Sequence, residues 1–296
     1  MAAPTTIALI GPGAIGSTVA AWLAQSPALA VTLCARTPVA RLAVETPDGP
    51  IAAAPAVLTD PAAARPVDWV LVCTKTYDAP GAAGWIERLL GPETRVAVLQ
   101  NGVEHLARFA PWVPLERIVP AMVDIPAERD APGRVRQRRE GVIVVPAGVN
   151  GAAFVDLFRH TALRVSTSDD FTSVLWRKLA VNCAGAVSAL TLKPHIVTRD
   201  PDIAELMYGL LAECVAVGRA EGAVLDDDTA RRVVEGYQAS PPDSVNSIHA
   251  DRMAGGRMEW DARNGVIARL GETHGISAPL NRLVATILRA AEPGPA

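Results

Sequence analysis

Three glycines near the start of the chain have the spacing of a phosphate-binding loop. Gly11, Gly13 and Gly16 follow the apolar run 6–10 and precede a helix-forming stretch at 17–24. In such a loop the first glycine allows a tight turn, the second lets a pyrophosphate approach the backbone, and the third lets helix and strand pack closely. The N–H groups at the helix start then favour negative charge. The pattern predicts a dinucleotide site formed by Gly11, Gly13, Ala14, Ile15 and Gly16.

Arg36 stands where an enzyme specific for NAD usually carries a carboxylate. It follows the second apolar run, 30–34, about 20 residues beyond Gly16. The next acidic residue is Glu45. Because a guanidinium pairs well with a 2′-phosphate, Arg36 predicts NADPH rather than NADH as the cofactor. A solvated surface arginine is the simpler alternative.

Two polar residues follow the next two apolar runs. Lys75 comes after the run 68–73, and Asn101 comes after the run 95–99. The carboxyl ends of parallel strands meet at one edge of a sheet, so we expect both residues on the nicotinamide side of the site. An ordinary turn at Asn101 and a solvated Lys75 are the alternatives.

Lysine is rare in this chain, which makes each lysine worth examining. The sequence has 28 lysines and arginines, of which only Lys75, Lys178 and Lys193 are lysines. Unlike arginine, lysine can give up its proton near neutral pH. Lys178 is four residues before Asn182, so both project from one helix face. Lys178 is therefore a candidate proton donor, although its stem could equally cover apolar surface.

Ser247 and Glu259 flank the pair Gly255–Gly256, which separates two expected helices. We expect Glu259 in the first turn of its helix, where the helix dipole favours a carboxylate. This placement by itself would explain Glu259 without a catalytic role.

The elements that must position these residues change character near residue 168. Before it, strands alternate with helices, which predicts a parallel, doubly wound α/β sheet. Strands are expected at 6–10, 30–34, 68–73, 95–99 and 117–123, short edge strands within 47–66, a hairpin over 135–145, and helices at 17–24, 79–90 and 103–110.

The second half shows helical patterns only. Helices are expected at 171–190, 201–221, 227–237, 244–254, 257–274 and 279–291. The sequence thus predicts an α/β protein with an N-terminal Rossmann dinucleotide-binding domain at 1–168 and a C-terminal all-helical substrate and catalytic domain at 169–296. We expect the active site in the cleft between the two domains.

Composition argues against several classes of partner. Half of the 296 residues are hydrophobic and the net charge is −3 with both signs mixed, so we expect neither nucleic acid nor a membrane as a partner. No run approaches the ~20 apolar residues of a membrane helix. The start carries no cationic, signal-like segment, and we expect a cytoplasmic protein. The helix at 257–274 leaves both a monomer and a homodimer open.

Taken together, the motifs resemble the ketopantoate reductase (2-dehydropantoate 2-reductase) family, in family order and over nearly the whole chain. They are Gly11-Pro12-Gly13-Ala14-Ile15-Gly16, Cys73-Thr74-Lys75-Thr76, Gln100-Asn101-Gly102-Val103, Trp176-Arg177-Lys178-Leu179-Ala180-Val181-Asn182, and the segment from Ser247 to Glu259. The resemblance implies an oxidoreductase that reduces 2-dehydropantoate to pantoate with NADPH, in pantothenate biosynthesis.

The same resemblance implies a role for each candidate residue. Lys178 would be the catalytic acid, and Glu259 would belong to the catalytic proton-transfer network. Asn101, Asn182 and Ser247 would bind the substrate, while Lys75 and Asn101 would contact the cofactor region. No metal is implied.

One position departs from the family pattern. Members commonly carry a second asparagine, followed by proline, four residues after the helix asparagine, whereas this chain has Ala186-Val187 there. A different 2-keto acid or a ketone is therefore the alternative substrate. A catalytically silent NADPH-binding sensor is a second alternative, and retention of Lys178 and Glu259 argues against it. The 3-hydroxy acid dehydrogenases also pair a Rossmann domain with an interdomain lysine, but the Gln100-Asn101-Gly102 turn favours the ketopantoate interpretation.

Overall fold

The computed structural model describes residues 3–293 of the chain, which form two compact units. The N-terminal unit comprises the residues up to Gln100 together with Glu104–Phe171. The helical unit comprises Asn101–Val103 together with the residues from Thr172 onward. Asn101 is thus the first residue of a three-residue segment that packs with the helices rather than with the sheet that precedes it.

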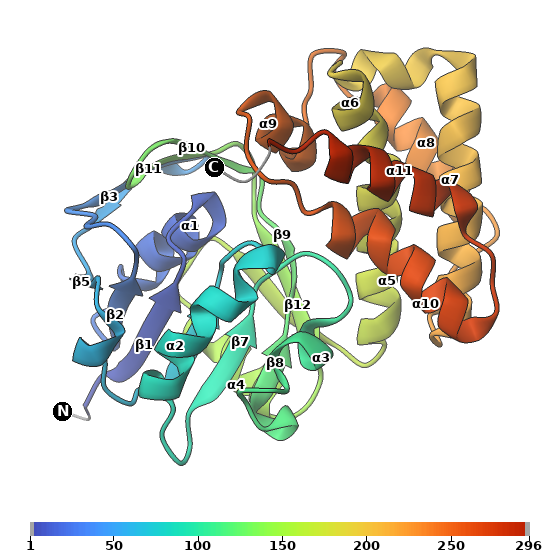
Figure 1. The fold of residues 1–296 in the computed structure, drawn as a ribbon. Coiled ribbons are helices and arrows are strands. Elements are labelled where there is room, and N and C mark those ends of the chain that lie inside the picture. Colours follow the sequence, from blue (N-terminus) through green and yellow to red (C-terminus); the bar gives the residue numbers. More distant parts are fainter. Residues whose placement is uncertain (1–2, 294–296) are drawn as a thin grey trace. The chain divides into compact units, whose positions relative to one another are not determined.

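A six-stranded parallel sheet forms the centre of the N-terminal unit (Figure 1). In spatial order its strands are β5 (Ala56–Leu58), β2 (Leu29–Cys34), β1 (Thr5–Ile10), β6 (Trp69–Val72), β7 (Arg95–Val98) and β8 (Ile118–Pro120). The order runs outward in both directions from β1 and β6, so the direction of winding reverses between those two strands. This is the doubly wound arrangement of a Rossmann fold, which confirms the predicted class.

Both faces of this sheet are buried. Ile7 and Leu9 of β1 belong to one apolar cluster, and the alternate residues Ala8 and Ile10 belong to another. Such a strand reads as a continuous apolar run because each face needs its own cover. The covering helices of the unit are α1 (Ala14–Leu23), α2 (Ala79–Leu89), α3 (His105–Phe109) and α4 (Val149–Leu157).

Two smaller sheets complete the N-terminal unit. One has the order β10 (Ala127–Ala131), β11 (Arg134–Gln137), β3 (Leu42–Thr46) and β4 (Gly49–Ala53), and the other has β13 (Arg164–Ser168), β12 (Val142–Pro146) and β9 (Met122–Asp124). The expected strand at 117–123 is in fact two strands, because the chain leaves the large sheet after Pro120 and β9 pairs elsewhere.

The hairpin predicted over 135–145 is wrong. The real hairpin joins β10 to β11 and turns at Gly133, whose φ is +75°. Gly141 is not a turn residue of a hairpin: a Cβ there would lie 2.7 Å from the Leu163 side chain, so this glycine provides packing space. β11 and β12 consequently belong to different sheets.

The helical unit contains no strand among its described residues, as predicted. Its helices are α5 (Phe171–Ala184), α6 (Ala186–Thr191), α7 (Pro201–Ala220), α8 (Thr229–Ala239), α9 (Ser247–Met253), α10 (Val266–His274) and α11 (Pro279–Ala290). Asp200 caps α7 by accepting hydrogen bonds from the N–H groups of Asp202 and Ile203, and Pro201 opens the helix.

The single helix expected at 171–190 is divided at Gly185. A Cβ at Gly185 would lie 2.1 Å from Tyr237 Oη and 2.8 Å from Asn246 Nδ2, and Asn246 Nδ2 donates to the Gly185 carbonyl at 2.8 Å. Side chains from other helices therefore occupy the space beside this residue. Ala186, the position of the missing family asparagine, becomes the first residue of α6 and is fully buried.

The helix expected at 257–274 begins later than predicted. Residues 256–259 are not helical, and a π-helical turn at Asp261–Gly265 leads into α10. Glu259 therefore precedes the helix instead of occupying its first turn. Its carboxylate still lies beside the first N–H groups of that helix, where the helix dipole favours negative charge.

Candidate functional site

The glycine loop has the backbone geometry that its sequence predicts. Gly11 has a φ of +88°, and a Cβ there would lie 2.9 Å from Thr74 N. A Cβ at Gly16 would lie 2.3 Å from the Gly11 carbonyl oxygen. The first and third glycines are thus required by close contacts within the fold.

Gly13 differs from its neighbours because no protein atom lies within 4 Å of the place a Cβ would occupy. It is the N-cap of α1, whose first turn contains no acidic residue. Helix geometry leaves the first N–H groups of α1, including those of Ala14 and Ile15, without intrahelical acceptors. The fold does not need a glycine here, whereas close approach of a phosphate to these N–H groups would.

Arg36 lies two residues beyond the end of β2, which runs parallel to β1, so it shares the sheet edge of the glycine loop. Its side chain is 88% exposed, and its one ion pair among the described residues is a long contact of 3.8 Å with Asp78. A guanidinium held so loosely is available to a phosphate at this edge.

Lys75 also lies at this edge, three residues beyond β6, and is half-buried. The segment that carries Lys75 is held by Gln100. The sequence did not indicate Gln100 as a site residue. Gln100 Nε2 donates to Thr74 Oγ1 at 3.0 Å and to the Lys75 carbonyl at 3.3 Å. The ends of β6 and β7 are therefore tied together by a side chain that is only 5% exposed.

His105 supports Gln100 from the other side. Its Nε2 lies 2.8 Å from the Gln100 carbonyl oxygen, so the neutral ring donates through Nε2. The side chain is 1% exposed. Burial lowers the pKa of His105 to about 4, the hydrogen bond to Gln100 partly opposes this shift, and the charge of Arg108 adds to it.

Three predicted site residues of the helical unit form one hydrogen-bonded chain. Asn101 Nδ2 donates to Glu259 Oε2 at 2.9 Å, and Asn182 Nδ2 approaches Asn101 Oδ1 at 3.4 Å. Glu259 is 4% exposed and Asn182 is 8% exposed. Segments that lie far apart in the sequence thus place two amides and a carboxylate side by side.

Lys178 lies one turn before Asn182 on α5, on the same helix face. Leu179 and Ala180, next to it, are buried in the core of the helical unit, while Lys178 itself is half-buried. The Lys178 ammonium is therefore carried by a helix that is packed into the core. It lies on the same helix face as Asn182, which contacts Asn101.

Ser247 is the first residue of α9 and is exposed. Its hydroxyl accepts a hydrogen bond of 2.7 Å from Arg263 Nη2. Arg263 was missed by the sequence analysis because the chain contains so many arginines. The signal in the sequence was the small and apolar run 265–268 that follows it, and in the structure every residue of 262–268 is buried.

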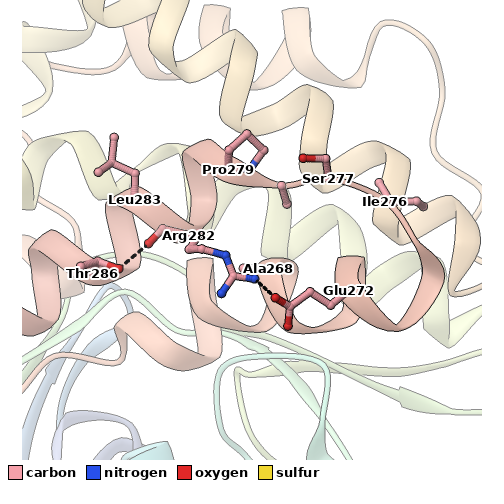
Figure 2. A pocket seen from close by; sticks show the side chains of 9 residues that line it. Ala268, Glu272, Ile276, Ser277, Pro279, Arg282, Leu283 and Thr286 are labelled. Atoms are coloured by element: carbon pink, nitrogen blue, oxygen red, sulfur yellow. Dashed lines mark hydrogen bonds and ion pairs between the residues drawn. The ribbon is translucent and has the colours of Figure 1, made fainter.

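One cavity of the helical unit lies away from these residues. It lies between α10 and α11, has a volume of about 490 Å³, and is lined by Glu272, Arg282 and Leu283 among others (Figure 2). None of the predicted site residues lines it.

Across residues 3–293, no helix is long and apolar enough to cross a membrane.

Comparisons with known proteins agree on one family. Residues 7–150 match the family model of ketopantoate reductase PanE/ApbA, and residues 170–292 match the model of its C-terminal part. The 2-dehydropantoate 2-reductase of Caulobacter vibrioides is 58% identical over 287 residues, which cover 97% of this chain and 99% of that protein. The Mycobacterium tuberculosis 2-dehydropantoate 2-reductase is 41% identical over 294 residues, or 98% of this chain and 99% of the relative.

A solved structure gives the same answer. The PanE/ApbA family ketopantoate reductase from Ralstonia eutropha JMP134 superposes with a TM-score of 0.87 at 32% identity, covering 97% of this chain and 98% of that one. Family models, relatives and structure all extend over both units. This chain belongs to the PanE/ApbA family of ketopantoate reductases.

Proposed function

We propose that this protein reduces the keto group of 2-dehydropantoate to give pantoate, with NADPH as the reductant. The observation that carries the proposal is the polar cluster of the helical unit, in which Lys178 shares a helix face with Asn182 and Asn182 leads through Asn101 to Glu259. This set offers one ammonium, two amides and one carboxylate, which are the groups that binding and protonating a keto acid requires.

Each residue of the cluster has a distinct task in this proposal. When bound, NADPH supplies the hydride that the keto carbon gains. Negative charge then grows on the keto oxygen, and the Lys178 ammonium stabilises it and gives up a proton to form the hydroxyl. General acid catalysis of this kind typically contributes about 10²–10⁴-fold in rate. Asn101 and Asn182 orient the substrate, and Glu259 accepts from Asn101 and holds its amide in place.

The cofactor assignment rests on the N-terminal unit. The chain belongs to a family of NAD(P)-dependent reductases, and its own residues favour NADPH. The open space at Gly13 and the N–H groups at the start of α1 suit a pyrophosphate, while the exposed Arg36 suits a 2′-phosphate. Lys75 completes this edge of the sheet.

The experiment that tests the proposal follows nicotinamide absorbance with 2-dehydropantoate and a small panel of other 2-keto acids, with NADPH and NADH in parallel. We expect kcat/KM for 2-dehydropantoate to exceed that of every other acid and to reach ~10⁴ M⁻¹s⁻¹ or more. Higher turnover of another keto acid would overturn the substrate assignment, and equal use of NADH would overturn the cofactor assignment.

A further inference from the structure

The most unusual charged residue of the helical unit is Arg263. Its side chain is only 2% exposed, and no carboxylate of the described residues forms an ion pair with it. Arginine is almost never fully buried without a partner of opposite charge, because the desolvation of a cation is costly. The fold keeps this cation in its interior even so.

The hydrogen bonds of Arg263 account for only part of its guanidinium. Nη2 donates to Ser247 Oγ, and Nε has no acceptor among the described residues. By contrast, the nearby Arg269 is exposed and pairs with Asp261. A buried donor without an acceptor normally costs free energy, so a ligand that supplies an acceptor would be bound favourably.

Ser247 connects this buried cation to an accessible surface. The Ser247 side chain accepts from Arg263 and is itself exposed. A hydroxyl that accepts a hydrogen bond through its oxygen retains its own proton to donate. Arg263 and Ser247 together therefore offer donors, and a positive charge, to an anion that reaches Ser247.

The phenol of Tyr237, which feels the charge of Arg263, is not a competing anion. Burial raises the pKa of Tyr237 to about 12, although the charge of Arg263 opposes this shift, so the phenol stays neutral and donates to the Val181 carbonyl. Tyr237 and Asn246 both lie against Gly185, the residue before Ala186.

We propose that Arg263, acting with Ser247, binds the carboxylate of the substrate and makes the protein selective for 2-keto acids over neutral ketones. The inference rests on the proposed function, in that it takes a 2-keto acid as the substrate. A carboxylate that accepts from the Ser247 hydroxyl supplies the negative charge that the buried guanidinium of Arg263 lacks, and a hydrogen bond to an ionised group is stronger than one between neutral groups.

The test compares a 2-keto acid with its neutral methyl ester in wild type, Arg263→Gln and Arg263→Lys. For Arg263→Gln we expect kcat/KM for the acid to fall about 10- to 100-fold, mainly through KM, which is the size expected of a hydrogen bond to a charged group. The ester should change by no more than about 3-fold. Arg263→Lys should fall between wild type and Arg263→Gln, and Arg269→Gln, which removes a neighbouring exposed arginine, is the matched control.

A purely structural role for Arg263 predicts a different pattern. If the guanidinium only joins α9 to the segment before α10, acid and ester should lose the same factor, and that result would overturn the inference. Because Arg263→Gln could fail to fold, Ser247→Ala provides a second variant at an exposed position. It should lower the ratio of acid to ester activity by about 3- to 10-fold, and an unchanged ratio would again contradict the inference.

The design separates this inference from the proposed function. If wild type reduces another 2-keto acid instead of 2-dehydropantoate, the ratio of acid to ester is measured on that acid and still decides the role of Arg263. If wild type reduces no keto acid, the proposed function fails. The thermal shift given by 2-dehydropantoate in wild type and Arg263→Gln then decides whether this residue binds the anion, and equal shifts would overturn the inference.

Discussion

The phosphate loop of the N-terminal unit and the polar cluster of the helical unit are built in opposite ways. The loop is six consecutive residues, Gly11 to Gly16, and close backbone contacts require its first and third glycines. The cluster takes its side chains from Asn101, α5 and the segment before α10. A loop of the first kind depends on local geometry, whereas a cluster of the second kind depends on the packing of a whole helical core.

This contrast predicts which changes affect binding and which affect chemistry. Substitutions in the N-terminal unit should alter cofactor affinity or preference and leave the chemical step intact. Substitutions in the helical cluster should slow the chemical step and leave cofactor affinity and preference unchanged.

The largest effect is expected at Lys178. Lys178→Ala should lower kcat by at least two orders of magnitude, because the keto oxygen loses its proton donor, while the Kd for NADPH stays within about twofold. Lys178→Arg keeps the charge and should also be slow, since a guanidinium does not release its proton. Lys193→Ala, at an exposed lysine of the same unit, is the control. Near-normal turnover of Lys178→Ala would show that Lys178 is not the proton donor.

The next effect concerns His105, which supports Gln100 in the N-terminal unit. Its pKa of about 4 lies below the usual value of 6.5, so the native state keeps the ring neutral while the unfolded chain takes up a proton below pH 6.5. The free energy of unfolding should therefore fall by about 3 kcal/mol as the pH drops from 6.5 to 4.

Urea unfolding at several pH values measures this loss. His105→Gln should be less stable at pH 7 but should show a shallower decline toward acid, and the exposed His160→Gln should keep the wild-type slope. Equal slopes in wild type and His105→Gln would show that other groups control the acid sensitivity.

Arg36 should affect the choice of cofactor and little else. Arg36→Ala should reduce the ratio of kcat/KM for NADPH to that for NADH by about 10- to 100-fold, the size of a lost hydrogen bond to a charged group. Arg159→Ala removes another exposed arginine that pairs with a single aspartate, and it should leave the ratio unchanged. An unaltered preference in Arg36→Ala would assign the 2′-phosphate to another residue.

The smallest effect is the most specific to the loop. A methyl group at Gly13→Ala meets no protein atom. The free energy of unfolding should therefore change by at most about 1 kcal/mol, the scale of a changed N-cap. The Kd for NADPH should nevertheless rise about 10-fold or more, because the added methyl occupies the approach of the pyrophosphate. Gly81→Ala, at a similarly open glycine in α2, should leave the Kd unchanged. An unchanged Kd in Gly13→Ala would place the pyrophosphate elsewhere.

The same contrast explains what could be predicted from the sequence. The strands of the large sheet were found because burial on both faces gives unbroken apolar runs, and the glycine loop was found because its spacing is local. The hairpin was misplaced because Gly141 and Gly133 look alike in sequence, although one provides packing space and the other turns the chain.

The helical cluster was harder to predict from the residues alone. Nothing near Glu259 in the sequence indicates that its carboxylate accepts from Asn101, which is 158 residues away. Arg263 belongs to no motif, and Gln100 entered only as the first residue of the motif Gln100-Asn101-Gly102-Val103. The importance of both comes from burial and hydrogen bonding in the folded chain. The break at Gly185 likewise depends on Tyr237 and Asn246, which belong to later segments.

The placement of Asn101–Val103 in the helical unit bears on whether this protein is modular. A gene fragment that starts at Thr172 would encode every helix from α6 to α11 and most of α5, yet it would lack the amide that Glu259 accepts from. A fragment that ends at Phe171 would carry that amide away from its partner. Cutting the chain at residue 171 would therefore separate the Asn101 amide from the Glu259 carboxylate, although both belong to the same compact unit.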